Sequence, residues 1–114
     1  MDDFIKKHLS DILNAIEEID DFYDGKKKLY KDFENNLLLR RGVERNIEII
    51  GEAINRILKV NSDIQITNAR KIVDTRNWVS HSYDAVSNDI LWSIVVNHLP
   101  KLKEEVRKLL YGQF

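Results

Sequence analysis

The sequence predicts an all-α protein, an up-and-down four-helix bundle whose last helix is kinked or split. Apolar residues recur at spacings of three and four in several long segments, and no segment shows the two-residue alternation of a half-buried strand. The chain has one proline and four glycines, so strong helix breakers are rare and the connections should be short. Its 114 residues fit a single helical domain over 1–114.

The first predicted helix runs from about Asp3 to Asp24. Asp2 or Asp3 can cap it, and a carboxylate at this end suits the positive pole of the helix dipole. Gly25 is expected to end it, because glycine readily adopts the left-handed conformation found after helices. The apolar stripe consists of Ile5, Leu9, Ile12, Ile16, Ile19 and Tyr23.

A lysine-rich connector over 25–35 leads to the second long helix, predicted from about Asn36 to Lys59. The connector has room for a short helical turn, and its Lys26–Lys28 run is expected to be a solvated loop rather than a phosphate-binding patch. Gly51 lies inside the second helix, where glycine costs about 1 kcal/mol relative to alanine. A close helix–helix crossing would explain it. The stripe here consists of Leu39, Val43, Ile47, Ile50, Ile54 and Ile57.

The third and fourth helices carry the rest of the pattern. The third should start near Thr67 or Asn68, both good capping residues, and run to about His81. Ser87 can cap the fourth. Pro100 falls within the apolar pattern of that last segment, so it should kink the helix or open a new one at its first turn. The apolar positions of the last segment are Leu91, Ile94, Val95, Leu99, Leu102, Val106 and Leu109 or Leu110.

Composition excludes several classes of chemistry. The chain has no cysteine, which rules out disulfides, a thiolate nucleophile and cysteine zinc sites. Its three histidines, His8, His81 and His98, are far apart, so no metal site is expected, and no glycine-rich phosphate loop is present. There is no signal-like or membrane-spanning apolar run, so we expect a cytoplasmic protein without a membrane partner. With a formal net charge of −1, any RNA-binding surface must be local or built by two subunits.

The most unusual stretch is the run Arg76-Asn77-Trp78-Val79-Ser80-His81-Ser82-Tyr83. Arg76 lies at the edge of the apolar face, where a buried guanidinium needs an acid, a carbonyl or an anionic ligand. Asn77 and His81 are four apart and share a helix face, whereas Arg76 and His81 are separated by about 140° on an ideal helix. Arg76 and His81 can therefore approach one ligand only if the helix end distorts or if two subunits contribute.

Each of these residues also has an ordinary structural interpretation. Arg76 could pair with a carboxylate on a neighbouring helix, and His81 could interact with the negative end of the helix dipole. Tyr83 could be an aromatic residue at the edge of the core. Taken from spacing alone, the structural and functional interpretations are about equally favoured.

Three blocks of the sequence resemble the HEPN family, in its HepT-like branch of small toxins. Arg76-Asn77 with His81 and Tyr83 is similar to the family's Arg-Asn-x-x-x-His-x-Tyr signature. The block 45–53, which contains Ile-Gly-Glu-Ala, resembles the second-helix motif of the branch. The block 90–102, with Trp92 and a Leu-Pro-x-Leu ending, resembles its final helix. Three blocks in this order, in a chain of this length, make the resemblance fairly specific.

The resemblance implies a HEPN-like bundle that forms a homodimer and cuts RNA without a metal or other cofactor. Arg76 would neutralise the scissile phosphate, His81 would transfer protons, and Asn77 would orient the phosphate or the histidine. The family further implies a type II toxin–antitoxin pair, in which a minimal nucleotidyltransferase antitoxin adds AMP to Tyr83.

Two other hypotheses remain open from the sequence. The chain could be a non-catalytic nucleotide-binding or partner subunit of a minimal nucleotidyltransferase, because binding and catalysis would use the same residues. It could also be a purely structural dimeric bundle, in which Arg76 is paired within its own chain and His81 faces solvent.

Overall fold

The computed structural model describes residues 2–74 and 88–112. Within these ranges the chain forms helices and connections and contains no strand, which confirms the predicted all-α class. The helices are α1 (Asp3–Phe22), α2 (Tyr30–Glu34), α3 (Leu37–Val60), α5 (Asn88–Ser93), the π-helix η1 (Ile94–His98) and α6 (Leu99–Tyr111). Residues 69–74 are also helical and belong to the predicted third helix.

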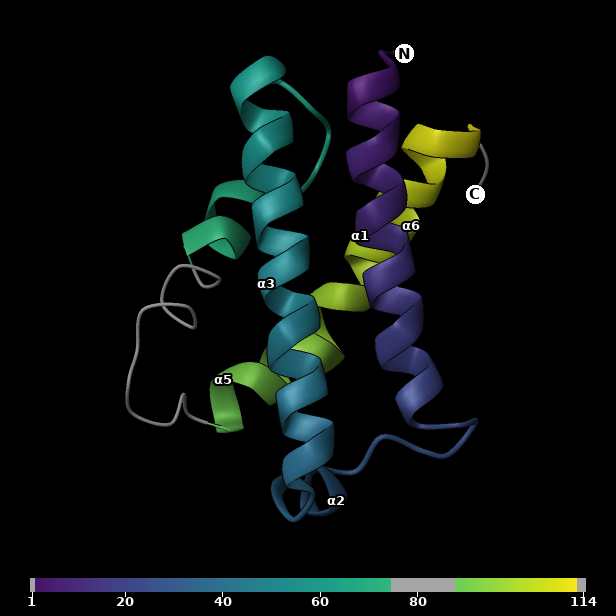
Figure 1. Ribbon diagram of the computed structural model, residues 1–114, viewed down its shortest axis with the longest axis vertical. Coiled ribbons are helices and arrows are strands. Elements are labelled where there is room, and N and C mark those ends of the chain that lie inside the picture. The colour runs from purple at the N-terminus through teal and green to yellow at the C-terminus, as the bar shows by residue number, and fades with distance from the viewer. Residues whose placement is uncertain (1, 75–87, 113–114) are drawn as a thin grey trace.

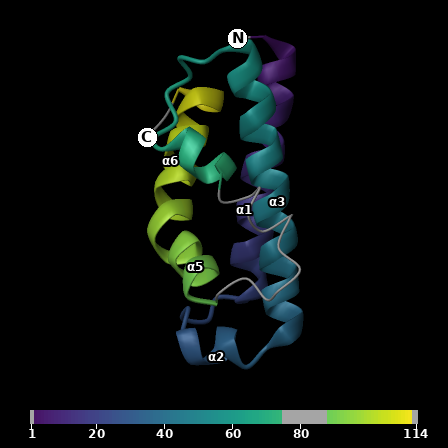
Figure 2. The ribbon, with the colours of Figure 1, turned by 90° about the vertical axis from the view of Figure 1, so that its left-hand side faces the viewer.

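α1 and α3 are antiparallel and form one wall of the bundle, and the continuous run α5–η1–α6 forms the other (Figures 1 and 2). The short α2 lies across the lower end, and residues 69–74 lie beside the upper part of α3. The chain thus runs down, up and, in its last segment, up again, and the last helix is split as predicted. None of the described helices combines the length and apolar composition needed to cross a membrane.

The predicted cap of the first helix is confirmed, and the second long helix begins with a side-chain cap as well. The side chain of Asp2 accepts a hydrogen bond from the Phe4 amide at 2.8 Å, and the side chain of Asn36 accepts one from the Leu39 amide at 3.0 Å. These bonds satisfy amide groups that have no partner inside the helix. After α1 the chain turns with Gly25 in the left-handed region, at φ +74°, as expected for a residue that ends a helix.

The predicted apolar stripes form the core. All six residues of the first stripe are buried, and so are five of the second, with Leu39 half-buried against them. From the last segment, Leu91, Ile94, Val95, Leu99, Leu102 and Val106 are buried. The pattern of threes and fours therefore identified the buried face of each long helix correctly.

The connector after α1 contains the short helical turn for which the sequence had room, and this turn is α2. Phe33 of α2 is fully buried and packs against Trp92 with ring centroids 5.5 Å apart. Lys26 and Lys27 are exposed as predicted, but Lys28 pairs with Asp20 at 2.9 Å and lies over the Tyr23 ring. Here the prediction was wrong for Lys28, because a carboxylate of α1 lies within its reach.

A second cation, from the last helix, reaches the same carboxylate. Lys103 of α6 donates to Asp20 at 3.0 Å. Burial alone would raise the pKa of Asp20, but the hydrogen bonds from Lys28 and Lys103 outweigh this effect and lower it. Asp20 thus ties α1 both to the connector and to α6.

α1 and α3 approach each other closely at Gly42. A Cβ built on Gly42 would lie 2.8 Å from Cε2 of Phe22, so the ring of Phe22 occupies the space that a side chain would need. Gly51 is buried within α3, and the crossing expected at Gly51 stays a prediction.

Candidate functional site

The four predicted site residues, Arg76, Asn77, His81 and Tyr83, lie outside the described residues. Ser87, the predicted cap of the fourth helix, also lies outside the described residues. The arrangement of the four site residues therefore stays a prediction, but the structure describes the residues on either side of the segment that holds them. In the sequence, that segment lies between the helical residues 69–74 and α5, which begins at Asn88.

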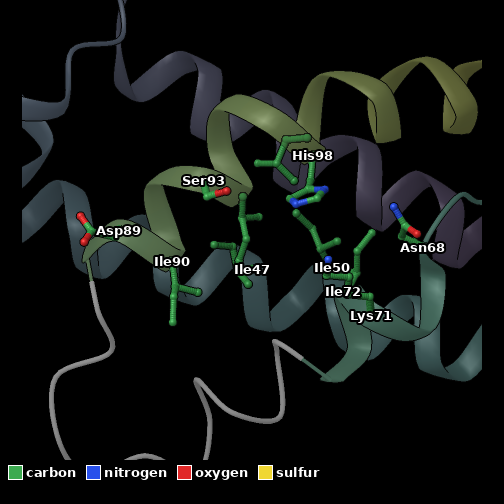
Figure 3. Close-up of a pocket in the computed structure, with 11 residues that line it drawn as sticks. Ile47, Ile50, Asn68, Lys71, Ile72, Asp89, Ile90, Ser93 and His98 are labelled. Carbon is green, nitrogen blue, oxygen red and sulfur yellow. The ribbon is translucent and has the colours of Figure 1, made fainter.

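A pocket of about 310 Å³ lies between α3, the helix at 69–74 and the run α5–η1–α6 (Figure 3). Its walls are mainly aliphatic, and its polar groups come from the last helix and from the helix at 69–74. The lining residues are Ile47, Ile50, Asn68, Lys71, Ile72, Asp89, Ile90, Ser93, Ile94, His98 and Leu99.

The pocket is the place where separate blocks of the sequence meet. Ile47 and Ile50 belong to the block 45–53, and the residues from Ile90 to Leu99 belong to the block 90–102. Ile72 comes from the helix that leads directly to Arg76. The two blocks that resemble the HepT-like branch outside the signature therefore form opposite walls of one pocket.

His98 owes its position to the π-helical turn that ends in it. Pro100 has no amide hydrogen, and its ring would crowd the carbonyl of residue 96 in a regular α-helix. The chain instead widens over Ile94–His98, and the Leu99 amide bonds to the carbonyl of Ile94, five residues back. Pro100 lies in the first turn of α6, so the second of the two predicted outcomes, a new helix that opens at the proline, is the one observed.

Single π-turns inside α-helices occur often at functional sites. Here the turn directs the half-buried ring of His98 toward Ile50 of α3 (Figure 3). The imidazole has no hydrogen-bond partner within the part of the chain that the structure describes.

Asn68 supplies a second polar group at the same end of the pocket. Its backbone is in the left-handed region at φ +58°, which asparagine tolerates better than most residues. Its carbonyl accepts from the Ile72 amide at 3.0 Å, so Asn68 immediately precedes the helix. Its side-chain amide has no hydrogen-bond partner among residues 2–74 and 88–112.

Thr67 anchors this helix to α6 instead of capping it. Its amide and its hydroxyl donate to the carboxylate of Glu105, the hydroxyl at 2.7 Å. Of the two predicted capping residues, Asn68 is therefore the one that borders the helix. The bond to Glu105 fixes the start of the helix that leads into the predicted site.

At the opposite end of the pocket, Asp89 accepts a hydrogen bond from the hydroxyl of Tyr30 at 3.0 Å. This bond, with the nearby negative charge, raises the pKa of Tyr30. Tyr30 also meets Trp92 edge to face, with centroids 5.7 Å apart. The first turn of α5, where the predicted segment ends, is thereby attached to α2.

Several exposed cations lie near the pocket. A chain with a net charge of −1 can bind RNA only through such a local group of positive side chains. Arg70 and Lys71 are exposed on the helix at 69–74, and Lys101 is exposed on α6. Lys101 also borders a small hollow that shares Asn68, Ile72 and His98 with the pocket. The described residues contain no group of three histidines or carboxylates that could hold a metal ion.

His98 and Asn68 were not recognised as site residues from the sequence. His98 was considered only as a metal ligand, and its distance from the other histidines argued against that role. The signal that could have identified it is the proline two residues later, because a proline inside a helical pattern displaces the helix locally. No comparable signal marks Asn68.

The fold is an all-α, HEPN-like bundle with a split last helix. The family model described as "Ribonuclease HepT-like" matches residues 12–109, and the chain belongs to this HepT-like family. A relative from Methanocaldococcus jannaschii named "Putative RNase MJ1380" is 36% identical over 90% of this chain and 93% of its own length. "Probable ribonuclease HepT" from Thermococcus cleftensis is 32% identical over 91% of this chain and 94% of its own length. No solved structure matches the fold significantly.

Proposed function

We propose that this chain is a metal-independent ribonuclease that acts as a homodimer, with Arg76 and His81 as its catalytic residues. The observation that carries the proposal is membership of the HepT-like family over residues 12–109, with relatives named as ribonucleases. The Arg76 to Tyr83 run supplies residue types that suit this chemistry, and it lies between two segments that border the pocket.

The reaction needs no protein nucleophile because RNA carries its own. The 2′-hydroxyl oxygen attacks the adjacent phosphorus, and the bond from phosphorus to the 5′-oxygen of the next nucleotide breaks. One His81 accepts the proton of the 2′-hydroxyl, and a second His81 protonates the departing 5′-oxygen. The products are a 2′,3′-cyclic phosphate and a 5′-hydroxyl, with no net oxidation or reduction.

Arg76 and Asn77 support this step. The guanidinium of Arg76 is planar and permanently charged, so it suits the negative charge that develops on the phosphate oxygens. Asn77 orients the phosphate or His81. Two subunits provide two copies of each group, which places a base and an acid on opposite sides of one phosphate.

We further propose that the chain is the toxin of a type II toxin–antitoxin pair. A minimal nucleotidyltransferase antitoxin would attach AMP to Tyr83, two residues from His81. The added nucleotide is bulky and anionic, so it would occupy the phosphate site and repel RNA.

The test is cleavage of a 5′-labelled RNA in EDTA by the wild type and by His81→Ala and Arg76→Ala. Loss of a general acid–base group should lower the rate by about 10²–10⁴-fold. Ser82→Ala is the matched control, because Ser82 lies in the same segment and has no proposed role. The products should carry 2′,3′-cyclic phosphate ends.

Loss of cleavage on chelation, or full activity of His81→Ala, would contradict the mechanism. Expression without a partner separates the proposal from a passive nucleotidyltransferase subunit, because an active toxin should arrest growth and His81→Ala should not. Size-exclusion chromatography with light scattering tests the dimer.

A further inference from the structure

We propose that the pocket between α3 and the last helix binds a nucleobase of the RNA strand next to the scissile phosphate. His98 and Asn68 would contact the polar edge of the base. This inference rests on the proposed ribonuclease function for the identity of its ligand, and on the described residues for the site itself.

The shape and lining of the pocket fit a heterocyclic base. Its volume of about 310 Å³ lies at the lower end of the range of about 300–1,000 Å³ that small-molecule pockets span. Half-buried Ile72 and exposed Ile90 provide aliphatic surfaces for the faces of a ring, above the buried Ile47 and Ile50, as in pockets that receive extruded bases. A lipid chain would use such walls as well, but it would leave the polar groups at one end without a partner.

Those polar groups are positioned rather than incidental. The π-turn directs the His98 ring toward the α3 isoleucines, and the left-handed backbone of Asn68 precedes the opposite helix. Neither side chain has a hydrogen-bond partner within residues 2–74 and 88–112. An imidazole and a carboxamide can donate to and accept from the edge of an unpaired base, which is how single-stranded RNA is commonly read.

Charge and chain position identify the rest of the ligand as a phosphodiester strand. Exposed Lys71 lines the pocket, exposed Arg70 precedes it on the same helix, and exposed Lys101 borders the adjoining small hollow. Asp74, the last described residue of the same helix, is two residues before Arg76. A strand whose base enters the pocket would therefore have its backbone near the proposed catalytic segment.

The experiment measures binding of a short single-stranded 2′-O-methyl oligoribonucleotide, which lacks the attacking hydroxyl and cannot be cleaved by the proposed route. One abasic nucleotide is moved along the strand, one position at a time. In the wild type, a single position should weaken binding about tenfold, the size of the loss expected when one base contact is removed.

In His98→Ala the complete strand should bind about tenfold more weakly than to the wild type, and the abasic substitution should cause little further loss. Such non-additivity marks two groups that act on each other. Asn68→Gly removes the amide while keeping the left-handed backbone accessible, and should weaken binding less than His98→Ala does. Asp24→Gly is the matched control, since Asp24 is also left-handed, at φ +48°, but lies at the end of α1. It should bind normally.

Methyl NMR gives a readout that does not depend on affinity. The oligonucleotide should shift the Ile72 and Ile90 methyl resonances and leave those of the α1 core residue Ile12 unchanged. An abasic series without effect, or Ile72 and Ile90 resonances that do not move at saturation, would overturn the inference. The inference would also be overturned if AMP shifted these resonances and no abasic position changed the affinity, because the pocket would then hold a free nucleotide.

The outcome is separable from that of the proposed function. If unmodified RNA is cleaved but no abasic position matters, the ribonuclease stands and the base pocket falls. If an abasic position matters and RNA is never cleaved, the pocket stands as an RNA-binding site and the catalytic proposal falls.

Discussion

Two hollows flank α3, each containing a histidine, and they differ in how their polar groups are satisfied. The one toward α1 has a volume of about 200 Å³ and is lined by Lys7, His8, Asp11, Ile49, Glu52, Ala53 and Arg56. Its charged residues form pairs, Lys7 with Asp11 and Arg56 with Glu52, both at 2.8 Å. The other is the larger pocket with His98, where Asp89 accepts a hydrogen bond from Tyr30 but the side chains of His98 and Asn68 have no partner among the described residues.

The difference shows which hollow is suited to a ligand. The His8 ring is buried under Phe4, with centroids 4.5 Å apart, and the neighbouring charges compensate each other within one helix turn. A ligand entering there would have to break existing ion pairs. At His98 and Asn68, which are partly or fully exposed, a ligand would replace water without breaking an ion pair of these two side chains, so this hollow is the better suited of the two.

The largest expected effect separates a core position of α3 from a position of α5 that lines the pocket. Ile54 is fully buried, and Ile54→Ala should lower the free energy of unfolding by about 2–5 kcal/mol. Ile90 lines the pocket and is 38% exposed, so Ile90→Ala should cost less than about 1 kcal/mol. Urea denaturation measures both. Equal losses would mean that the pocket is part of the packed core.

A smaller effect is expected where the pocket helix is attached to α6. Glu105→Gln weakens the bonds from Thr67 and should lower the free energy of unfolding by about 1 kcal/mol, since the carboxylate is partly exposed. Hydrogen exchange at the Ile72 amide should accelerate as well. Glu104→Gln is the control. Glu104 is the exposed neighbour of Glu105, and its side chain makes no described hydrogen bond to this helix. Equal exchange rates in the two variants would contradict this anchoring role.

The hollow at His8 predicts a pH dependence. Burial, with the adjacent Lys7, lowers the pKa of His8 below its ordinary value of 6.5. The unfolded chain therefore binds a proton more readily, so this contribution to stability is complete above about pH 6.5 and declines as the pH falls below it. Unfolding of His8→Gln and wild type at a series of pH values should show a weaker acid-side decline in the variant. Parallel curves would show that His8 does not carry the dependence.

The smallest effect concerns the close approach of α1 and α3 at Gly42. Gly42→Ala gains about 1 kcal/mol of helix propensity but displaces the half-exposed ring of Phe22, so the net change should be less than about 1 kcal/mol. In a Phe22→Ala background the obstacle is gone, and Gly42→Ala should then stabilise by about 1 kcal/mol. Thermal unfolding of the four proteins tests this, and the absence of coupling would contradict the contact.

Local patterns were enough to predict most of the helical framework. The spacing of Ile5 to Tyr23 and the cap at Asp2 depend on residues within a few positions of each other, and both were predicted correctly. The lysine connector was harder, because Lys28 finds its partner Asp20 across a turn and Lys103 approaches the same carboxylate from far along the chain. Long-range ion pairs leave no periodic signal.

What the sequence by itself determined is the class of the fold, the buried face of each long helix and the family. Helical periodicity and capping are local, and the three blocks can be compared without coordinates. Only the tertiary structure decided that Ile47, Ile72 and His98 face one pocket, since their relation depends on how three helices pack and on a π-turn forced by Pro100.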